Sequence, residues 1–313
     1  MLRTTRASLA VFLLLCLLGS LGPLRGELAP SPATSAFPPW LLPAWPYLLI
    51  AVLALACTVL RRQRWLPAKL LTSAIFVGLG LFVVPNVALR VVESWVDPFT
   101  QVILLALTPV FTVVLEPHIA GSSTQPRYAL AAVTTAASGL LLIFPFSLPR
   151  SAFDAAGWLI LLLAAGVIAT AYCTVARLAS QHSRQSGTSL VAIISSTSAL
   201  SFLFISILAS TLHLRFAAQQ TSLIWSTLIE ASSLLLLFWL LPRLSASRLT
   251  TRFILSPLFS SLVSLILLRP TVTARDVGGL LLAAAGSAWL LFAPLTKCDA
   301  PVSPLNLGNN PLL

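Results

Sequence analysis

Ten long apolar runs divide this chain, and they constrain its fold more than any other feature of the sequence. An α-helix rises about 1.5 Å per residue, so about 20 apolar residues cross the hydrocarbon core of a bilayer. Because backbone polar groups find no water there, helices are the expected structure. The runs contain 17 to 23 residues each and are 8–24, 44–60, 69–89, 99–117, 128–146, 156–176, 190–212, 220–241, 250–268 and 276–294.

The composition supports a membrane protein and argues against soluble classes. Apolar residues make up 58% of the 313 residues and charged residues only 9%, against roughly 45–50% and about 25% in soluble domains. The net charge of +11 would suggest nucleic-acid binding in a soluble protein. Here, however, the basic residues lie in short loops between apolar runs, which is typical of a multi-pass membrane protein. We therefore expect the lipid bilayer as surroundings and no nucleic acid as a partner.

The loop charges predict how the chain is oriented. If the N-terminus is cytoplasmic, 13 basic residues fall on the cytoplasmic side and 6 on the external side, with Arg252 counted among the cytoplasmic loop charges. The positive-inside rule then favours both termini in the cytoplasm. The location expected is the cytoplasmic membrane, which is the inner membrane if the source is bacterial.

A repeat with a constant offset of 148 residues relates the two halves. The letters TPVFT at 108–112 align with SPLFS at 256–260, and the same shift places the first two runs on the sixth and seventh. Two five-helix repeats result, 8–146 and 154–294, followed by a tail at 295–313 that we expect to be flexible. Since five is odd, the second repeat enters the membrane from the opposite side. The predicted fold class is therefore an all-α integral membrane protein with ten transmembrane helices in two inverted repeats, as in many secondary transporters.

The first run has two interpretations. Arg3 and Arg6, followed by a short apolar stretch, are similar to the start of a signal peptide. The repeat instead makes this run the counterpart of the sixth and favours a structural helix. Whether residues 1–24 are retained or cleaved stays open at this stage.

The motifs around the repeated proline resemble a known family. LALTPVFTVVLEPHIAG, followed by an arginine and a small-residue helix ending in SGLLLIF, resembles the end of an EamA domain, and SASRLTTRFILSPLFSSLVSLILL with RDVGGLLLAAAGSAWLLF repeats it. The chain is similar to ten-helix members of the drug/metabolite transporter superfamily over about 69–294. The resemblance implies a central cavity lined by the first, third and fourth helices of each half. It also implies transport of small metabolites, such as amino acids or hydrophobic solutes, with export as the expected direction.

Glu230 is the leading candidate for the transport step. It is the central residue of run 220–241, with Trp225 and Ser226 nearby. A central acid costs about 2.5–3.5 kcal/mol on insertion scales, so it should face a cavity or a partner. Such an acid can carry a proton or bind an amine, and the alternative is a structural acid hydrogen-bonded between helices. Asn86 and Tyr172, in the third and sixth runs, are further polar candidates for the substrate or proton pathway, or for helix packing.

Pro109 and Pro257 occupy equivalent positions in the two repeats. Each removes a backbone donor and disturbs the carbonyl four residues earlier, and the hydroxyls of Thr108 and Ser256 can satisfy freed groups. Paired interruptions point to a hinge or a binding site in transporters. The alternative is a static kink.

The remaining residues predict neither an enzyme nor a cofactor. The 3 His and 4 Cys residues have no metal-ligand spacing, and the 8 acids are scattered rather than paired for catalysis. We expect a secondary transporter whose partners are the bilayer, a small-molecule substrate and a proton. A non-transporting accessory protein of the same fold is the alternative, and a membrane-embedded transferase is a weaker one. The substrate, the direction, the coupling ion and a homodimer are left open.

Overall fold

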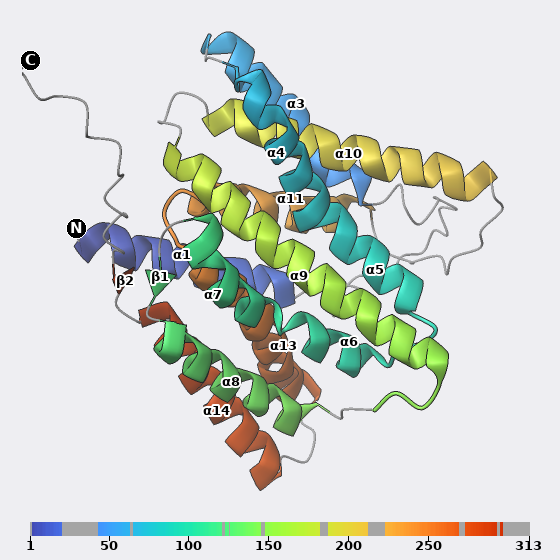
Figure 1. Ribbon diagram of the computed structural model, residues 1–313, viewed down its shortest axis with the longest axis vertical. Coiled ribbons are helices and arrows are strands. Elements are labelled where there is room, and N and C mark those ends of the chain that lie inside the picture. The colour runs from blue at the N-terminus through green and yellow to red at the C-terminus, as the bar shows by residue number, and fades with distance from the viewer. Residues whose placement is uncertain are drawn as a thin grey trace, which may run out of the picture.

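Nearly all of the described structure is helical (Figure 1). The computed structural model describes residues 2–20, 43–62, 65–120, 123–124, 126–144, 148–181, 187–211, 223–268, 273–292 and 295–296. The elements are α1 Leu2–Ser20, α3 Ala44–Leu60, α4 Ala68–Gly78, the π-helix η1 Leu79–Val83, α5 Val84–Val92, α6 Pro98–Leu105, α7 Thr108–Ile119, β1 Ser123–Thr124, α8 Pro126–Ile143, α9 Ala152–Gln181, α10 Gly187–Thr211, α11 Leu223–Leu240, α12 Ala246–Thr250, α13 Arg252–Leu268, α14 Ala274–Phe292 and β2 Leu295–Thr296.

Within the described residues, each predicted apolar run overlaps one helix or consecutive helices. Among the described residues, five helical stretches are long and apolar enough to cross a membrane, namely Ala68–Val92, Pro98–Ile119, Ala152–Ala179, Gly187–Ser210 and Ala274–Phe292. Shorter apolar helices cover Arg6–Ser20, Ala44–Leu60, Ala129–Ile143 and Thr227–Leu240. The prediction of an all-helical chain is confirmed, and the five long apolar helices are those of a multi-pass membrane protein.

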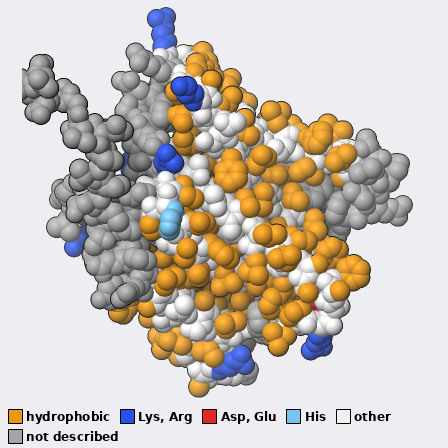
Figure 2. All heavy atoms as spheres, in the orientation of Figure 1, with side chains coloured by type: hydrophobic (Ala, Val, Ile, Leu, Met, Phe, Trp, Pro, Cys, Tyr) orange, Lys and Arg blue, Asp and Glu red, His pale blue; other side chains and the backbone are white. Residues whose placement is uncertain are grey.

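The surface of the bundle is apolar over a wide area. Large side chains such as Leu163, Phe204, Leu281 and Trp289 are exposed. Figure 2 shows apolar side chains across the middle of the visible face, with Lys and Arg toward its margins. Soluble monomers rarely expose contiguous apolar patches of this kind, whereas helices that face lipid require them.

Two antiparallel helix pairs lie far apart in the bundle, α3 with α10 and α8 with α14 (Figure 1). In the first pair, Tyr47 near the start of α3 stacks on Phe202 late in α10, with 5.6 Å between ring centroids. The hydroxyl of Thr58 near the end of α3 donates to the Thr188 hydroxyl at the start of α10, at 3.1 Å. Side chains at both ends of α3 therefore fix the register of this pair.

Close backbone contact holds the second pair, α8 and α14, together. A Cβ atom on Gly139 would lie 2.6 Å from the Gly279 carbonyl oxygen, and one on Gly286 would lie 2.5 Å from that of Ala132. No side chain larger than hydrogen fits without displacing backbone, so glycine is required for this approach. The strand pair extends the contact beyond the helix ends, because Ser123 pairs with Thr296.

The helices between these pairs have corresponding neighbours. The first helix, α1, packs against α11 and α13, while α9 packs against α5 and α7. Likewise α4 packs against α10, and α11 packs against α3. Long-range contacts therefore bind the N-terminal and C-terminal halves of the chain into one bundle.

Prolines have different local effects at the predicted positions. The helix is interrupted before Pro109, because α6 ends at Leu105 and α7 begins at Thr108. The Thr108 hydroxyl donates to the Leu105 carbonyl at 2.6 Å and so satisfies an acceptor at the break. At Pro257, in contrast, α13 is continuous, and the break in this part of the chain lies at the junction of α12 and α13.

The π-helix η1 interrupts the third apolar run, and the sequence pattern did not predict it. Pro85, the second residue of α5, lies just after it and lacks the amide hydrogen that an α-helix would use. A π-turn accommodates the missing backbone hydrogen bond, and such turns are frequent at functional sites.

Candidate functional site

Four side chains from different helices interact in the interior, and we call Tyr47, Tyr172, Glu230 and Arg252 the central cluster. They come from α3, α9, α11 and α13, respectively. Glu230, Arg252 and Tyr172 all lie close enough to Tyr47 to influence its hydroxyl electrostatically. The Arg252 guanidinium carbon lies 5.4 Å from the centroid of the Tyr172 ring, which is a cation–π distance. The cluster thus combines one acid, one base and two phenols.

The helices turn these groups inward. Tyr172 is fully buried and Tyr47 nearly so, whereas Glu230 and Arg252 are half-buried. Leu234 and Leu237 follow Glu230 on the same face of α11, and both are buried. Side chains four and seven residues apart share a helix face, so Glu230 lies on the face that packs into the bundle.

One hydroxyl group of the cluster and one beside it are buried without a hydrogen-bond partner in the described part of the chain. They are Tyr172 Oη and Thr227 Oγ1, the latter one helical turn before Glu230. Buried polar groups are nearly always paired in proteins, and each exception requires an explanation. Hydroxyls so close to an acid and a base are suited to a polar ligand.

An aromatic row lies beside the cluster. Tyr47 contacts Phe82 at 5.0 Å between ring centroids, and Phe82 contacts Phe238 at 6.1 Å. Phe82 belongs to η1, so the π-helix determines which ring meets Tyr47. The site therefore offers an apolar wall next to groups of opposite charge.

The structure brings together two of the predicted site residues, Glu230 and Tyr172. Asn86 instead donates to the Phe82 carbonyl at 2.7 Å, one turn earlier, so its amide is engaged on its own helix. Trp225 and Ser226 belong to α11, but their side chains lie outside the described residues.

The hydroxyl of Ser256 is not used like that of Thr108. It donates to the Cys16 carbonyl in α1 at 3.4 Å, whereas the Thr108 hydroxyl bonds within its own segment. A Cβ atom on Gly19 would also lie 3.0 Å from Ser256 Oγ. Ser256 therefore marks a close crossing of α1 and α13.

Arg252 requires a correction, because the sequence analysis counted it as a loop charge. It is the first residue of α13, and its guanidinium lies over the rings of Tyr172 and Phe253. The signal was present in the sequence, since Arg252 falls within the apolar run 250–268. Tyr47 was missed as well, because a single tyrosine near the start of an apolar run does not distinguish an interfacial ring from an interior one.

A second buried acid joins distant parts of the chain, and we call this contact the Glu116 clamp. Glu116 near the end of α7 accepts hydrogen bonds from the backbone N–H groups of Ala246 at 3.1 Å and Ser247 at 3.3 Å, and also from the Ser247 hydroxyl. The carboxylate satisfies donors at the start of α12 that have no intrahelical acceptor. Burial lowers the pKa of the nearby Arg248 guanidinium, and Glu116 opposes this shift.

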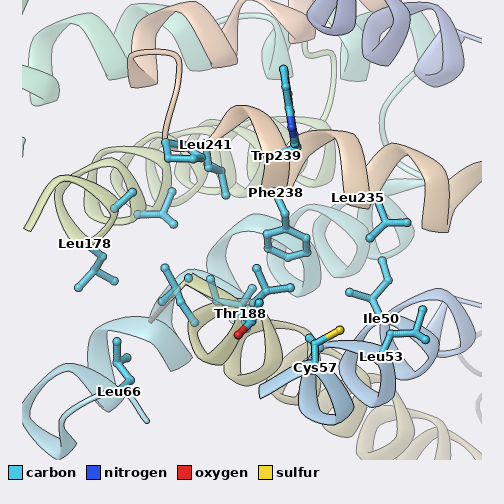
Figure 3. Close-up of a pocket in the computed structure, with 18 of the residues that line it drawn as sticks. Ile50, Leu53, Cys57, Leu66, Leu178, Thr188, Leu235, Phe238, Trp239 and Leu241 are labelled. Atoms are coloured by element: carbon cyan, nitrogen blue, oxygen red, sulfur yellow. The ribbon is translucent and has the colours of Figure 1, made fainter. Parts of the chain in front are cut away.

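A cavity of about 620 Å³ lies between α3, α9, α10 and α11 (Figure 3), and we call it the lateral cavity. Its walls are mostly apolar, with Arg61 and Arg243 at one end. Figure 3 shows the Phe238 ring pointing into the cavity and the Trp239 ring pointing away from it. Because Phe238 also contacts Phe82, the aromatic row lies between the cavity and Tyr47.

Comparisons with known proteins bear on the fold alone. No family model matches the chain, and no curated protein matches it either. The chain is similar to solved structures, among them a protein crystal structure with a TM-score of 0.67 and 17% sequence identity over 91% of this chain and 96% of the other. The fold and the surface define a helical multi-pass membrane protein. Its distinguishing feature is a polar and aromatic cluster in the interior.

Proposed function

We propose that this protein is a secondary transporter that moves small metabolites across the cytoplasmic membrane by alternating access. In this proposal ten transmembrane helices form two inverted five-helix repeats, both termini are cytoplasmic, and the protein belongs to the EamA group of the drug/metabolite transporter superfamily that the sequence resembles. The observation that carries the proposal is the central cluster, where opposite charges lie beside buried hydroxyls that have no hydrogen-bond partner among the described residues.

The neighbours of each helix support the inverted repeat. If the ten apolar runs are numbered, the contacts of α1 with α11 and α13 join run one to runs eight and nine. The contacts of α9 with α5 and α7 join run six to runs three and four. An exchange of the two repeats converts one set into the other. The antiparallel pairs, run two with run seven and run five with run ten, each contain one helix from either repeat in equivalent positions. Exchange of the repeats therefore leaves each pair unchanged, as a two-fold axis in the membrane plane requires.

The central cluster supports binding of a small molecule with both an amine and a carboxylate. Arg252 can pair with a carboxylate, and Glu230 can pair with an amine or carry a coupled proton. The rings of Tyr47 and Phe82 provide an apolar contact for a side chain. Amino acids with apolar side chains combine these properties, and we propose them as the substrate class.

Breaks and bridges in the helices support a conformational exchange. The interruption before Pro109 and the π-helix next to Pro85 are places where helices can bend. The Glu116 clamp ties α7, in the first repeat, to α12, in the second. With both termini cytoplasmic, this clamp closes the cytoplasmic end, and its opening would accompany exposure of the cluster to that side.

An efflux assay in proteoliposomes tests this function. Vesicles are loaded with an equimolar mixture of the twenty amino acids, and mass spectrometry follows their release with and without a pH gradient. We expect at least one apolar amino acid to leave faster than from protein-free vesicles. Arg252→Gln should abolish the difference, and Glu230→Gln should remove its dependence on the pH gradient. Glu93→Gln, an exposed acid outside the cluster, is the control. Equal release of all twenty from wild-type and protein-free vesicles would refute the proposed substrate class.

A further inference from the structure

The lateral cavity opens at the outer surface of the bundle, between α3 and α11. Leu53 on α3 and Leu235 on α11 line it and are 51% and 50% exposed, whereas Ala54 and Ile194 behind them are buried. A cavity whose flanks are exposed and whose floor is buried opens sideways between two helices. In a bilayer, the molecules that reach such an opening are lipids.

The cavity has the length of one lipid leaflet. On α3 its lining extends from Ile50 to Arg61, eleven residues further on, which corresponds to about 16 Å of helix. This is roughly half of a hydrocarbon core of about 30 Å. When the apolar end lies at the bilayer midplane, the arginine therefore lies at the level of the headgroups.

Both cations lie at the same end of the cavity. Arg61 is exposed and follows the last residue of α3, and Arg243 follows α11. The Arg243 guanidinium carbon lies 3.6 Å from the centroid of the Trp239 ring, and the side chain also donates to the Trp239 carbonyl, so it is held in position. The described residues that line the cavity include neither Asp nor Glu. The positive end thus lacks an acidic counterpart in the wall.

We propose that the lateral cavity binds an anionic glycerophospholipid of the surrounding leaflet. One acyl chain occupies the apolar part between α3 and α11, and the headgroup phosphate accepts hydrogen bonds from Arg61 and Arg243. Basic pockets between transmembrane helices recognise anionic headgroups in this way, and arginine suits phosphate through paired N–H donors. This lipid site is separate from the proposed transport site and does not depend on it.

Binding is measured with the purified full chain in detergent, by native mass spectrometry. The probe is a short-chain phosphatidylglycerol, with phosphatidylcholine of the same chain length for comparison. We expect phosphatidylglycerol to bind more tightly than phosphatidylcholine. Either Arg61→Gln or Arg243→Gln should weaken the affinity for phosphatidylglycerol about five-fold, which is the effect of losing roughly one contact between an arginine and the headgroup. Arg62→Gln is the matched control, because Arg62 is exposed and adjacent to Arg61 but does not line the cavity.

Thiol labelling locates the lipid independently of the arginines. Cys57 lines the cavity and is exposed, whereas Cys16 and Cys173 are buried. In a Cys298→Ser background, phosphatidylglycerol should slow maleimide labelling of Cys57. It should not slow labelling of a cysteine placed by Leu281→Cys on the exposed face of α14.

Each of four results would overturn the lipid proposal. They are equal binding of both phospholipids, an Arg62→Gln effect as large as that of Arg61→Gln, unchanged Cys57 labelling while phosphatidylglycerol remains bound, and protection of Cys57 by glycerol 3-phosphate alone. The last result would identify a soluble phosphate compound as the occupant. Tight, arginine-dependent binding that protects Cys57 would support the proposal even if no amino acid is transported.

Discussion

Replacing Glu116 with alanine should strongly destabilise the protein, because the Glu116 clamp satisfies three donors at a single buried carboxylate. The side chain is 2% exposed, so water cannot take over its role without a rearrangement. The acceptor oxygens lie 3.1 Å and 3.3 Å from the backbone nitrogens of Ala246 and Ser247. These nitrogens are at the start of α12, where a helix has no acceptor of its own.

The magnitude follows from the donors left behind. A buried donor without a partner costs about 1–3 kcal/mol, so the two backbone groups together predict a loss of about 2–6 kcal/mol in the free energy of unfolding for Glu116→Ala. Glu116→Gln keeps one acceptor oxygen but loses the charge, and hydrogen bonds to a charged group contribute about 1.5–3 kcal/mol. Ser247→Ala removes only the hydroxyl donor, and should cost about 1 kcal/mol.

The assay is equilibrium unfolding of the purified protein in mixed micelles with an increasing fraction of a denaturing detergent. A double-mutant cycle of Glu116→Gln with Ser247→Ala should give a coupling energy of about 0.5–3 kcal/mol, since the two side chains are in direct contact. Glu93→Gln changes an exposed acid and should stay within about 1 kcal/mol of wild type. A Glu116→Ala variant as stable as Glu93→Gln, or a cycle with no coupling, would show that the clamp does not hold the fold together.

Three further outcomes are expected. Gly139→Ala should lower the free energy of unfolding by about 1–3 kcal/mol, because its Cβ would lie 2.6 Å from a carbonyl oxygen of α14. Gly278 has open space around it, so Gly278→Ala should be neutral or stabilising by up to about 1 kcal/mol. The same loss of stability in both glycine variants would contradict the close contact of α8 with α14. Tyr172→Phe should be as stable as wild type, because the hydroxyl has no partner among the described residues. Efflux of amino acids should slow about ten-fold or more if that hydroxyl binds a charged substrate group. Unchanged efflux would show that the hydroxyl is not part of the site. Glu230→Gln should fold normally and lose the pH dependence of efflux, while Glu93→Gln retains it, and a pH profile preserved in Glu230→Gln would exclude Glu230 as the proton carrier.

The positions of the helices could be predicted from the sequence because lipid imposes a length on each apolar run. Run 69–89 became a helical stretch from Ala68 to Val92, and run 276–294 became α14. Run 156–176 was too short, since α9 extends to Gln181. A helix can continue past its apolar part into polar surroundings, so hydrophobicity marks the lipid-exposed part rather than the ends of the helix. The π-helix was invisible for a related reason, because it leaves the apolar pattern unchanged.

The candidate site was only partly predictable, because its geometry depends on how the helices are rotated. Glu230 and Tyr172 were identifiable as polar residues within apolar runs. The partner of Glu116 was not, since Ser247 lies 131 residues away along the chain and in a different helix. Asn86 shows the opposite error, because a polar side chain inside a run can bond to its own backbone. Sequence patterns select polar residues, but the packing of the helices decides which of them meet.

The opposite charges of the central cluster are difficult to explain by stability alone. On insertion scales Glu230, in the middle of its apolar run, costs about 2.5–3.5 kcal/mol, Arg252 at the start of α13 adds a further cost, and replacing buried charges by apolar residues is often neutral or stabilising. The half-buried state of both side chains reduces this cost where the space beside them admits water or a polar solute. Under the proposed function, a zwitterionic substrate supplies the complementary charges in one conformation and water does so in the other. The free-energy cost of keeping two charges in the interior is then offset in both conformations.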